Sequence, residues 1–351
     1  MLEPQATPDP LLALGVFLLA VALLGLLFWP RRGVVGRLLR VARITERVRL
    51  EDALKQLYHI TVGGRAATVE TLAGSLEVRR GVAVRLVERL TERGLARAEN
   101  GRLTLTPTGQ TYALRMVRTH RLWERYLADR SGLAPAEWHE EAERLEHALS
   151  DQQVEELSAG MGHPRYDPHG DPIPTTTGEL PASSGQHLSA FPLGHAAIVV
   201  HLEDEPAESF QRLLDLGLRP GARLRLLSAD PNEVRFRFDG REQVLPSVVG
   251  DLITVEPLPA DVVLDEEVHA TLADLPPGGA ARVVRVSAAC QGPQRRRLLD
   301  LGVVPGTIIT AQFSSPDGDP SAYLIRGALI ALRKAQAALI QVDLVPLEQA
   351  G

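Results

Sequence analysis

The sequence predicts a multidomain protein of mixed α+β class, and three observations lead to this prediction. A stretch of 19 residues near the N-terminus carries no charged side chain and is long enough to cross a bilayer as a helix. A largely helical region follows, interrupted by one Asn-Gly turn between two short alternating segments. The last part contains a unit of roughly 70 residues that occurs twice and is rich in short strands.

Composition narrows the class of protein. The chain has 351 residues and so exceeds one ordinary domain, and its net charge of −6 argues against a wholly basic nucleic-acid coat protein. The single cysteine, Cys290, excludes a disulfide framework and a cysteine-based zinc site, and it is compatible with a reducing cytoplasm. Because aromatic residues make up only 4% of the chain, we do not expect single-strand binding by base stacking.

The first predicted element, within residues 1–30, is a transmembrane helix over Leu11–Trp29. The segment before it carries Glu3 and Asp9, whereas arginines are frequent after it. The positive-inside rule therefore places the N-terminus outside and the bulk of the chain in the cytoplasm, as in a single-pass protein of the cell inner membrane. A cleaved signal peptide is the alternative, which is disfavoured because its positive charges would precede the apolar run. A buried soluble helix would rarely lack polar residues all round.

Residues 31–112 are predicted to form a winged helix-turn-helix domain. An amphipathic helix is expected over 41–59, a short helix begins after Thr68 as its N-cap, and a third helix spans 79–93 and ends at a glycine. The Asn-Gly dipeptide at 100–101 then joins two alternating segments, which is the strongest short-range signal for a hairpin. Three helices followed by a hairpin is the order of a winged helix.

The third helix of this domain is predicted to contact DNA. Arginines lie away from its apolar stripe and also flank the hairpin, and arginine is well suited to guanine edges and phosphates in the major groove. The alternative is an arginine-rich surface helix in a domain that only packs or binds proteins, since the fold alone does not establish DNA binding. The six candidate residues are Arg79, Arg80, Arg85, Arg89, Arg97 and Arg102.

Residues 113–185 are predicted to form an all-α domain followed by a linker, and its helices carry a candidate metal site. His120 and Glu124 are four residues apart, so they share one face of a helix. Imidazole and carboxylate ligands suit Mn(II), Fe(II), Co(II), Ni(II) or Zn(II) better than Ca(II). The alternative interpretation is a solvated acidic helix. A second helical segment presents the candidates His139, Glu143, Glu146 and His147.

The remainder of the chain is an internal repeat. The sequence RLLDLGLRPG at Arg212–Gly221 recurs as RLLDLGVVPG at Arg297–Gly306. Short strands broken by Gly and Pro, with one short helix in each unit, predict a small β-barrel used twice, over residues 186–259 and 264–346. No nucleophile lies beside a base and no phosphate loop is present in either unit, so we expect no enzymatic activity.

Four stretches of the helical region resemble the diphtheria-toxin-repressor family of metal-dependent transcriptional regulators: LTPTGQTYA, MVRTHRLWERYLADRSGL, WHEEAERLEHALSD and GDPIP. The resemblance covers roughly residues 50–174. It implies a homodimer that holds divalent iron or manganese between the winged helix and the dimerisation helices. The symmetry of such a dimer implies a palindromic operator in double-stranded DNA.

Carried across residue by residue, the resemblance implies two metal sites. One site would use His120, Glu124 and His139. The other would use a residue six positions before Tyr58, which is Asp52, together with the second-helix residues Glu143, Glu146 and His147.

The resemblance also bears on the metal and on the repeated units. Iron-type members have a sulfur residue at the position of Glu143 and a methionine at that of Asp52, whereas manganese-type members have carboxylates at both. Mn²⁺ is therefore the first choice and Fe²⁺ the second, in keeping with a hard ligand set. The repeated units resemble FeoA-type, SH3-like domains. In iron-type members the first such domain lends a Glu and a Gln to the metal, but here Glu208 lies off the expected spacing, so we expect no ligand from it.

We therefore expect a metal-dependent, membrane-tethered, DNA-binding transcriptional regulator that represses metal-uptake genes. The alternative is a membrane-associated accessory protein of metal transport that uses its winged-helix and FeoA-like domains for protein contacts. A metalloenzyme is a third and weaker alternative, because no general acid or base stands apart from the ligands.

Overall fold

The computed structural model describes the following parts of the chain: Leu14 and residues 34–182, 184–259, 262, 264, 269–287 and 289–345. The predicted anchor, Leu11–Trp29, lies outside these parts apart from Leu14. Across the described residues, no helix is both long and apolar enough to cross a membrane. The chain divides into two compact units, residues 1–116 and 117–351.

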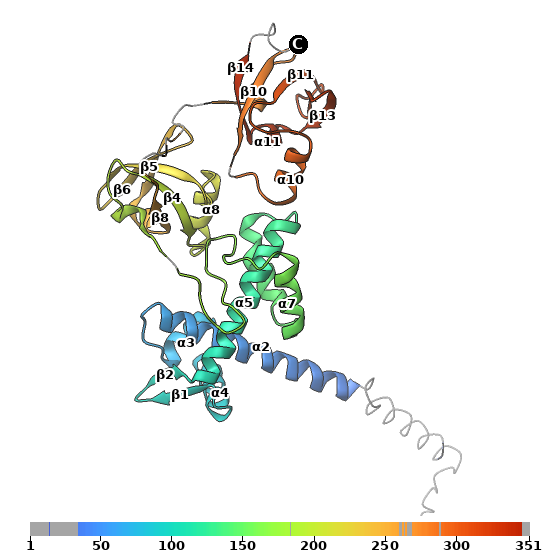
Figure 1. Ribbon diagram of the computed structural model, residues 1–351. Coiled ribbons are helices and arrows are strands. Elements are labelled where there is room, and N and C mark those ends of the chain that lie inside the picture. Colours follow the sequence, from blue (N-terminus) through green and yellow to red (C-terminus); the bar gives the residue numbers. More distant parts are fainter. Residues whose placement is uncertain are drawn as a thin grey trace, which may run out of the picture. The chain divides into compact units, whose positions relative to one another are not determined.

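The first unit has the predicted order of three helices and a hairpin, as Figure 1 shows. Its longest helix extends beyond the predicted 41–59, and an apolar stripe of Leu50, Leu54 and Leu57 is buried on it. The elements are α2 (Val34–Val62), α3 (Val69–Ser75), α4 (Arg80–Glu92), β1 (Ala96–Glu99) and β2 (Arg102–Leu105).

Local signals in the sequence explain where these elements begin and end. The predicted cap is confirmed, because the Thr68 hydroxyl accepts a hydrogen bond from the backbone N–H of Thr71. The predicted hairpin is confirmed too, since Asn100 and Gly101 both adopt positive φ, at 51° and 75°, between the antiparallel strands. Gly109 lets the first turn of the next helix lie close to Leu95, because a Cβ there would lie 1.8 Å from the Leu95 carbonyl oxygen.

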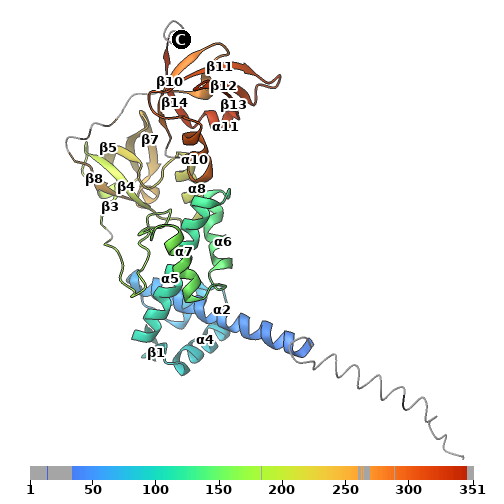
Figure 2. The same cartoon turned by 45° about the vertical axis from the view of Figure 1, so that its right-hand side comes forward.

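The next helix, α5 (Pro107–Arg130), begins in the first unit and continues into the second. The helical region that follows is divided into η1 (Pro135–Glu137), α6 (Trp138–Leu145) and α7 (Asp151–Gly160). Figure 2 shows α6 and α7 beside α5. Ser150 caps α7 by accepting from the N–H of Gln153. The predicted linker is partly ordered, because an isolated bridge joins Tyr166 to Pro172.

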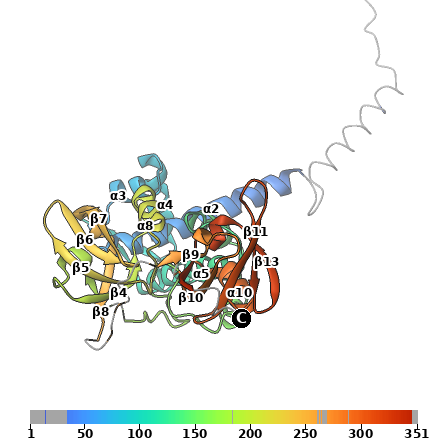
Figure 3. The same ribbon diagram turned by 90° about the horizontal axis from the view of Figure 1, so that it is seen from above.

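Two six-stranded antiparallel sheets complete the second unit, and they repeat one topology. The first has the order β3-β8-β4-β5-β6-β7, and the second has the same order in the corresponding strands β9-β14-β10-β11-β12-β13. Each sheet has its own apolar core, and Figure 3 shows the strands of both sheets from above.

The elements of the first sheet are β3 (Gln186–His187), η2 (Leu188–Ala190), β4 (Ala196–Leu202), α8 (Ala207–Asp215), β5 (Arg223–Ala229), β6 (Glu233–Phe238), β7 (Arg241–Pro246), α9 (Ser247–Gly250) and β8 (Ile253–Pro257). Those of the second are β9 (Ala270–Thr271), η3 (Leu272–Asp274), β10 (Ala280–Val286), α10 (Gly292–Asp300), β11 (Ile308–Ser314), β12 (Ser321–Ile325), β13 (Ala328–Leu332), α11 (Lys334–Ala337) and β14 (Ile340–Val345).

The prediction of two small β-barrels is wrong in one respect, because the sheets do not close into barrels. Among the described residues, no ladder joins β3 to β7 or β9 to β13, so each sheet remains open. The physical reason lies at the edges: β3 and β9 have two residues each, which is too short to complete a closed ladder. The sheets bend through register shifts in β4 and β10 and cover one apolar core on one side.

Candidate metal centre

A buried carboxylate lies between two imidazoles in the second unit. His120 and Glu124 occupy adjacent turns of α5, and His120 Nε2 is 3.0 Å from Glu124 Oε1. Helix α6 brings His139 to the same oxygen, with its Nδ1 at 3.2 Å, and this atom is 3.3 Å from His120 Nε2. The three ligand atoms lie within 4.8 Å of one another. The structure thus brings together the three residues predicted for the first site.

Without a metal, the pKa shifts of this cluster favour an ionised Glu124 and a protonated His139. Burial raises the pKa of the Glu124 carboxyl, but the His120 charge and hydrogen bonds from both imidazoles outweigh it, so this pKa lies well below its ordinary value. Hydrogen bonds to Asp204, Glu124 and Glu143, in that order of strength, raise the pKa of His139 to about 12. The cluster therefore holds a proton on His139 where a cation would otherwise bind.

The loop after α7 adds two residues that the sequence analysis missed. His169 Nδ1 lies 3.8 Å from Glu124 Oε2, and Asp167 completes a second group of buried ligand atoms around Glu124. Asp167 Oδ1 also orders the loop by accepting hydrogen bonds from the backbone N–H groups of His169, Gly170 and Asp171, each at 2.9 Å. A Cβ on Gly170, which has φ +99°, would lie 2.0 Å from the Val200 carbonyl oxygen, so glycine lets this loop lie against β4.

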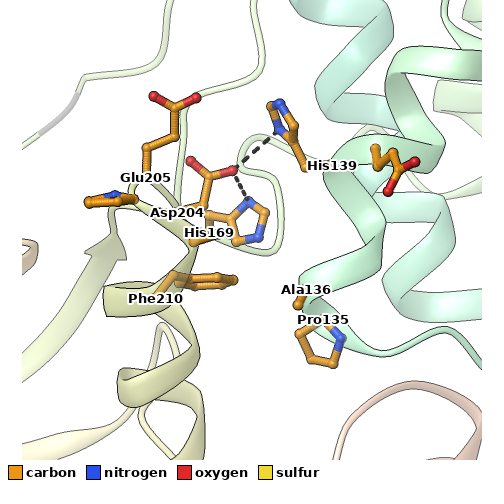
Figure 4. A pocket seen from close by; sticks show the side chains of 10 residues that line it. Pro135, Ala136, His139, His169, Asp204, Glu205 and Phe210 are labelled. Carbon is orange, nitrogen blue, oxygen red and sulfur yellow. Dashed lines mark ion pairs between the residues drawn. The ribbon is translucent and has the colours of Figure 1, made fainter.

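The first FeoA-like domain also reaches the cluster, contrary to our expectation. Asp204, in the turn between β4 and α8, lies 3.3 Å from His139 Nδ1 and 3.9 Å from His169 Nδ1, as the dashed lines in Figure 4 show. Glu208, which we considered for this role, lies exposed in the first turn of α8. The acidic run from Glu203 to Glu205 was the available signal, but nothing in its spacing pointed to the helical domain.

Of the residues predicted for the second site, Glu146 and His147 lie side by side within the second unit. Glu146 is buried, its Oε2 lies 2.5 Å from His120 Nδ1, and its Oε1 lies 3.6 Å from His147 Nε2. Glu143 is about half exposed and lies 3.6 Å from His139 Nε2 instead. Asp52 lies on α2 in the first unit, so its union with Glu146 and His147 stays a prediction.

These positions give Glu146 a role that spacing did not reveal. Glu146 contacts Nδ1 of His120, whereas Nε2 of the same ring faces Glu124. A carboxylate on the second ring nitrogen fixes the orientation of a metal-binding imidazole. The six residues His120, Glu124, His139, Asp167, His169 and Asp204 fit a divalent cation because they offer only imidazole nitrogens and carboxylate oxygens. Among the described residues, the buried Nε2 of His169 has no hydrogen-bond partner.

The predicted DNA-contacting arginines are all exposed on the first unit. Arg79 is the N-cap of α4, and Arg80 begins the helix with its Nε 2.9 Å from Glu70 Oε1. Arg89 pairs with Glu92 at 3.2 Å. Among the described residues, no ion pair involves the remaining arginines, which are Arg85, Arg97 and Arg102.

Comparison with known proteins identifies the class to which this fold and cluster belong. Residues 106–175 match the family model "Iron dependent repressor, metal binding and dimerisation domain", and residues 186–257 and 270–344 each match the FeoA domain. The chain is 31% identical over 221 residues to the iron-dependent repressor IdeR of Mycobacterium leprae, which covers 59% of this chain and 96% of that protein.

Two further similarities extend this result. A manganese-dependent transcriptional repressor solved with manganese is 31% identical, has a TM-score of 0.54, and covers 60% of this chain and 100% of its own. A probable metal transport system membrane protein of Chlamydia trachomatis is 39% identical over 88 residues, which are 25% of this chain and 20% of that protein. The chain belongs to the diphtheria toxin repressor and IdeR family of metal-dependent transcriptional repressors. The family's members are repressors and not enzymes.

Binding of a divalent cation to this cluster should release protons. In the metal-free protein His139 stays protonated up to a pKa of about 12, and that proton must leave before Nδ1 can bind a cation. Affinity for Mn(II) should therefore rise with pH. Calorimetric titration in buffers of different ionisation enthalpy measures both effects. An affinity that is constant from about pH 6 to 8, with no proton released, would contradict this assignment.

Proposed function

We propose that the chain is a metal-responsive repressor that binds double-stranded DNA as a homodimer. The observation that carries this proposal is the buried group around Glu124, in which residues from α5, α6, the loop after α7 and the first FeoA-like domain converge. A divalent cation would supply the positive charge that now comes from protonated imidazoles. Its binding would then favour one arrangement of these elements, which is the basis of a switch.

Mn(II) is our first choice of metal and Fe(II) the second. The cluster contains no sulfur ligand, and Cys290 is buried in the core of the second FeoA-like domain. Oxygen and nitrogen ligands lower the preference for softer ions, although the Irving–Williams order favours Co, Ni and Zn over Mn in any such site. Asp52, with Glu146 and His147, is proposed as a second ligand set that couples metal to the DNA-binding domain.

The proposed DNA interface is the exposed N-terminal half of α4 with the hairpin beside it. Exposed arginines on both elements supply charge for phosphates and donors for guanine. A dimer presents two such interfaces, so a palindromic operator follows from its symmetry. Repression of metal-uptake genes is the regulatory outcome that we propose, since it would lower metal import once the metal is plentiful.

The rival proposal is an accessory role in metal transport through protein contacts. The similarity of 88 residues to a probable metal transport membrane protein favours it, although those residues are only 20% of that protein. The two proposals differ in one property, metal-dependent binding to DNA.

Replacing Glu124 by Gln should abolish or strongly weaken metal-dependent DNA binding. The substitution keeps the volume of a buried side chain and removes the negative charge that faces His120 and His139. We expect the Mn(II) concentration that gives a half-maximal gel shift to rise by at least about 10- to 100-fold. The matched control is Glu156→Gln, an exposed carboxylate on α7. If Glu124→Gln retains wild-type metal dependence, the cluster is not the sensor. A wild-type chain that binds no DNA at any metal concentration would favour the transport role.

Replacing Arg80 and Arg85 by Ala should weaken operator binding without changing metal affinity. Each lost base or phosphate contact should cost about 1–3 kcal/mol of binding free energy. Arg130→Ala, at the exposed end of α5, is the control. Fluorescence anisotropy with an operator duplex measures the DNA affinity. Unchanged affinity in the double variant would assign α4 to protein contacts.

We also propose that residues 11–29 anchor the protein in the inner membrane with the N-terminus outside. Its support is the charge-free segment and the arginines behind it. The full-length chain should fractionate with membranes, and a chain that starts at Arg31 should not. Recovery of the intact full-length chain in the soluble fraction would overturn this proposal.

A further inference from the structure

A pocket of about 630 Å³ opens beside the metal cluster, between the helical domain and the first FeoA-like domain. Its walls are largely apolar: Pro135 and Ala136 lie on one side and Phe210 on the other, as Figure 4 shows. Three members of the cluster line it, namely His139, His169 and Asp204. Glu140 and Glu205, both exposed, complete its lining with negative charge.

The side chains of the cluster differ widely in their exposure to solvent. The exposed fraction of the side chain is 44% for His139, 22% for Asp204, 4% for His169 and 3% for Glu124. The two more exposed residues are only 3.3 Å apart, and each lies within 4 Å of a buried one. Consecutive ligand atoms therefore connect the pocket to the buried carboxylate.

The pocket is far larger than one ion requires. A water molecule occupies about 30 Å³ in the liquid, so the volume admits a cation that still carries much of its hydration shell. At the inner end, the buried His169 ring packs edge-on to Phe210, and its Nε2 has no hydrogen-bond partner among the described residues. A wide pocket that carries two exposed carboxylates and ends at two members of the cluster suits the passage of a hydrated cation.

We propose that this pocket is the route by which the divalent cation reaches and leaves the buried cluster, with Asp204 and His139 as its first protein ligands. The inference rests on the proposed metal-sensing function. Glu140 and Glu205 raise the local concentration of cations by electrostatic attraction. The apolar walls make no polar contact that would retain the ion, so they delimit the path without adding affinity.

Narrowing the pocket provides the test, because an obstruction on a path changes both rate constants and leaves their ratio unchanged. The variants are Ala136→Phe and Ala207→Phe, which enter the pocket from opposite walls without removing a ligand. Association of Mn(II) with the full-length chain is followed by stopped-flow tryptophan fluorescence, to which Trp138 contributes from a ring 6.0 Å from that of His169. Dissociation is measured with excess chelator, and equilibrium dialysis gives Kd.

Each variant should slow association and dissociation by a similar factor, about tenfold or more, with Kd within about twofold of wild type. The double variant Glu140→Gln, Glu205→Gln should associate with Mn(II) more slowly than wild type at low ionic strength. At high salt its association rate should equal that of wild type, because salt screens the attraction. Ala182→Phe, in a separate pocket of about 440 Å³, is the matched control and should change neither rate.

Unchanged rates in both wall variants would overturn the proposal. A weaker Kd with an unchanged association rate would also overturn it, because the pocket would then be part of the binding site. Failure of the wild-type chain to bind Mn(II) or Fe(II) at equilibrium would be a different result, since it would overturn the proposed function itself.

Discussion

The rest of the site depends on the carboxylate of Glu124, which is buried beside three imidazoles. A buried carboxylate is strongly destabilising unless positive partners and hydrogen bonds compensate for its lost hydration. Here the partners are His120 on the same helix, His139 on α6 and His169 on the loop after α7. Each partner belongs to a different element, so a single charge draws three segments together. Asp204 extends this electrostatic connection to the first FeoA-like domain through His139.

The same interaction explains a difference between the two halves of the repeat. The turn before α8 contains Glu203, Asp204 and Glu205, whereas the corresponding residues 287–291, before α10, contain no carboxylate. Only the first copy presents carboxylates in this turn. The second copy is joined to the first by another set of contacts, in which Asp239 of the β6–β7 turn accepts hydrogen bonds from Arg285 at 3.2 Å and Gln341 at 3.1 Å.

The sequence predicted those parts of the structure that depend on local periodicity. His120 and Glu124 were found because a helix repeats every 3.6 residues, and the Thr68 cap and Asn-Gly hairpin were found from turn chemistry. Asp167, His169 and Asp204 were missed because they lie in loops, where spacing carries no information on distant contacts. His139, Glu143, Glu146 and His147 were placed on one helical face. Helix α6 ends at Leu145, and within it His139 and Glu143 form an i,i+4 pair. Closure of the sheets depends on edge pairing, which strand patterns do not encode.

The most direct test of the account is the position of a bound ion. Anomalous diffraction from crystals of the Mn(II)-loaded protein, recorded on either side of the manganese absorption edge, locates the metal without assumptions about its ligands. The account predicts a peak within about 2.0–2.3 Å of Glu124 and of at least one imidazole nitrogen, from His139, His120 or His169. A loaded crystal with a peak beside Glu146 and His147 and none at Glu124 would contradict it.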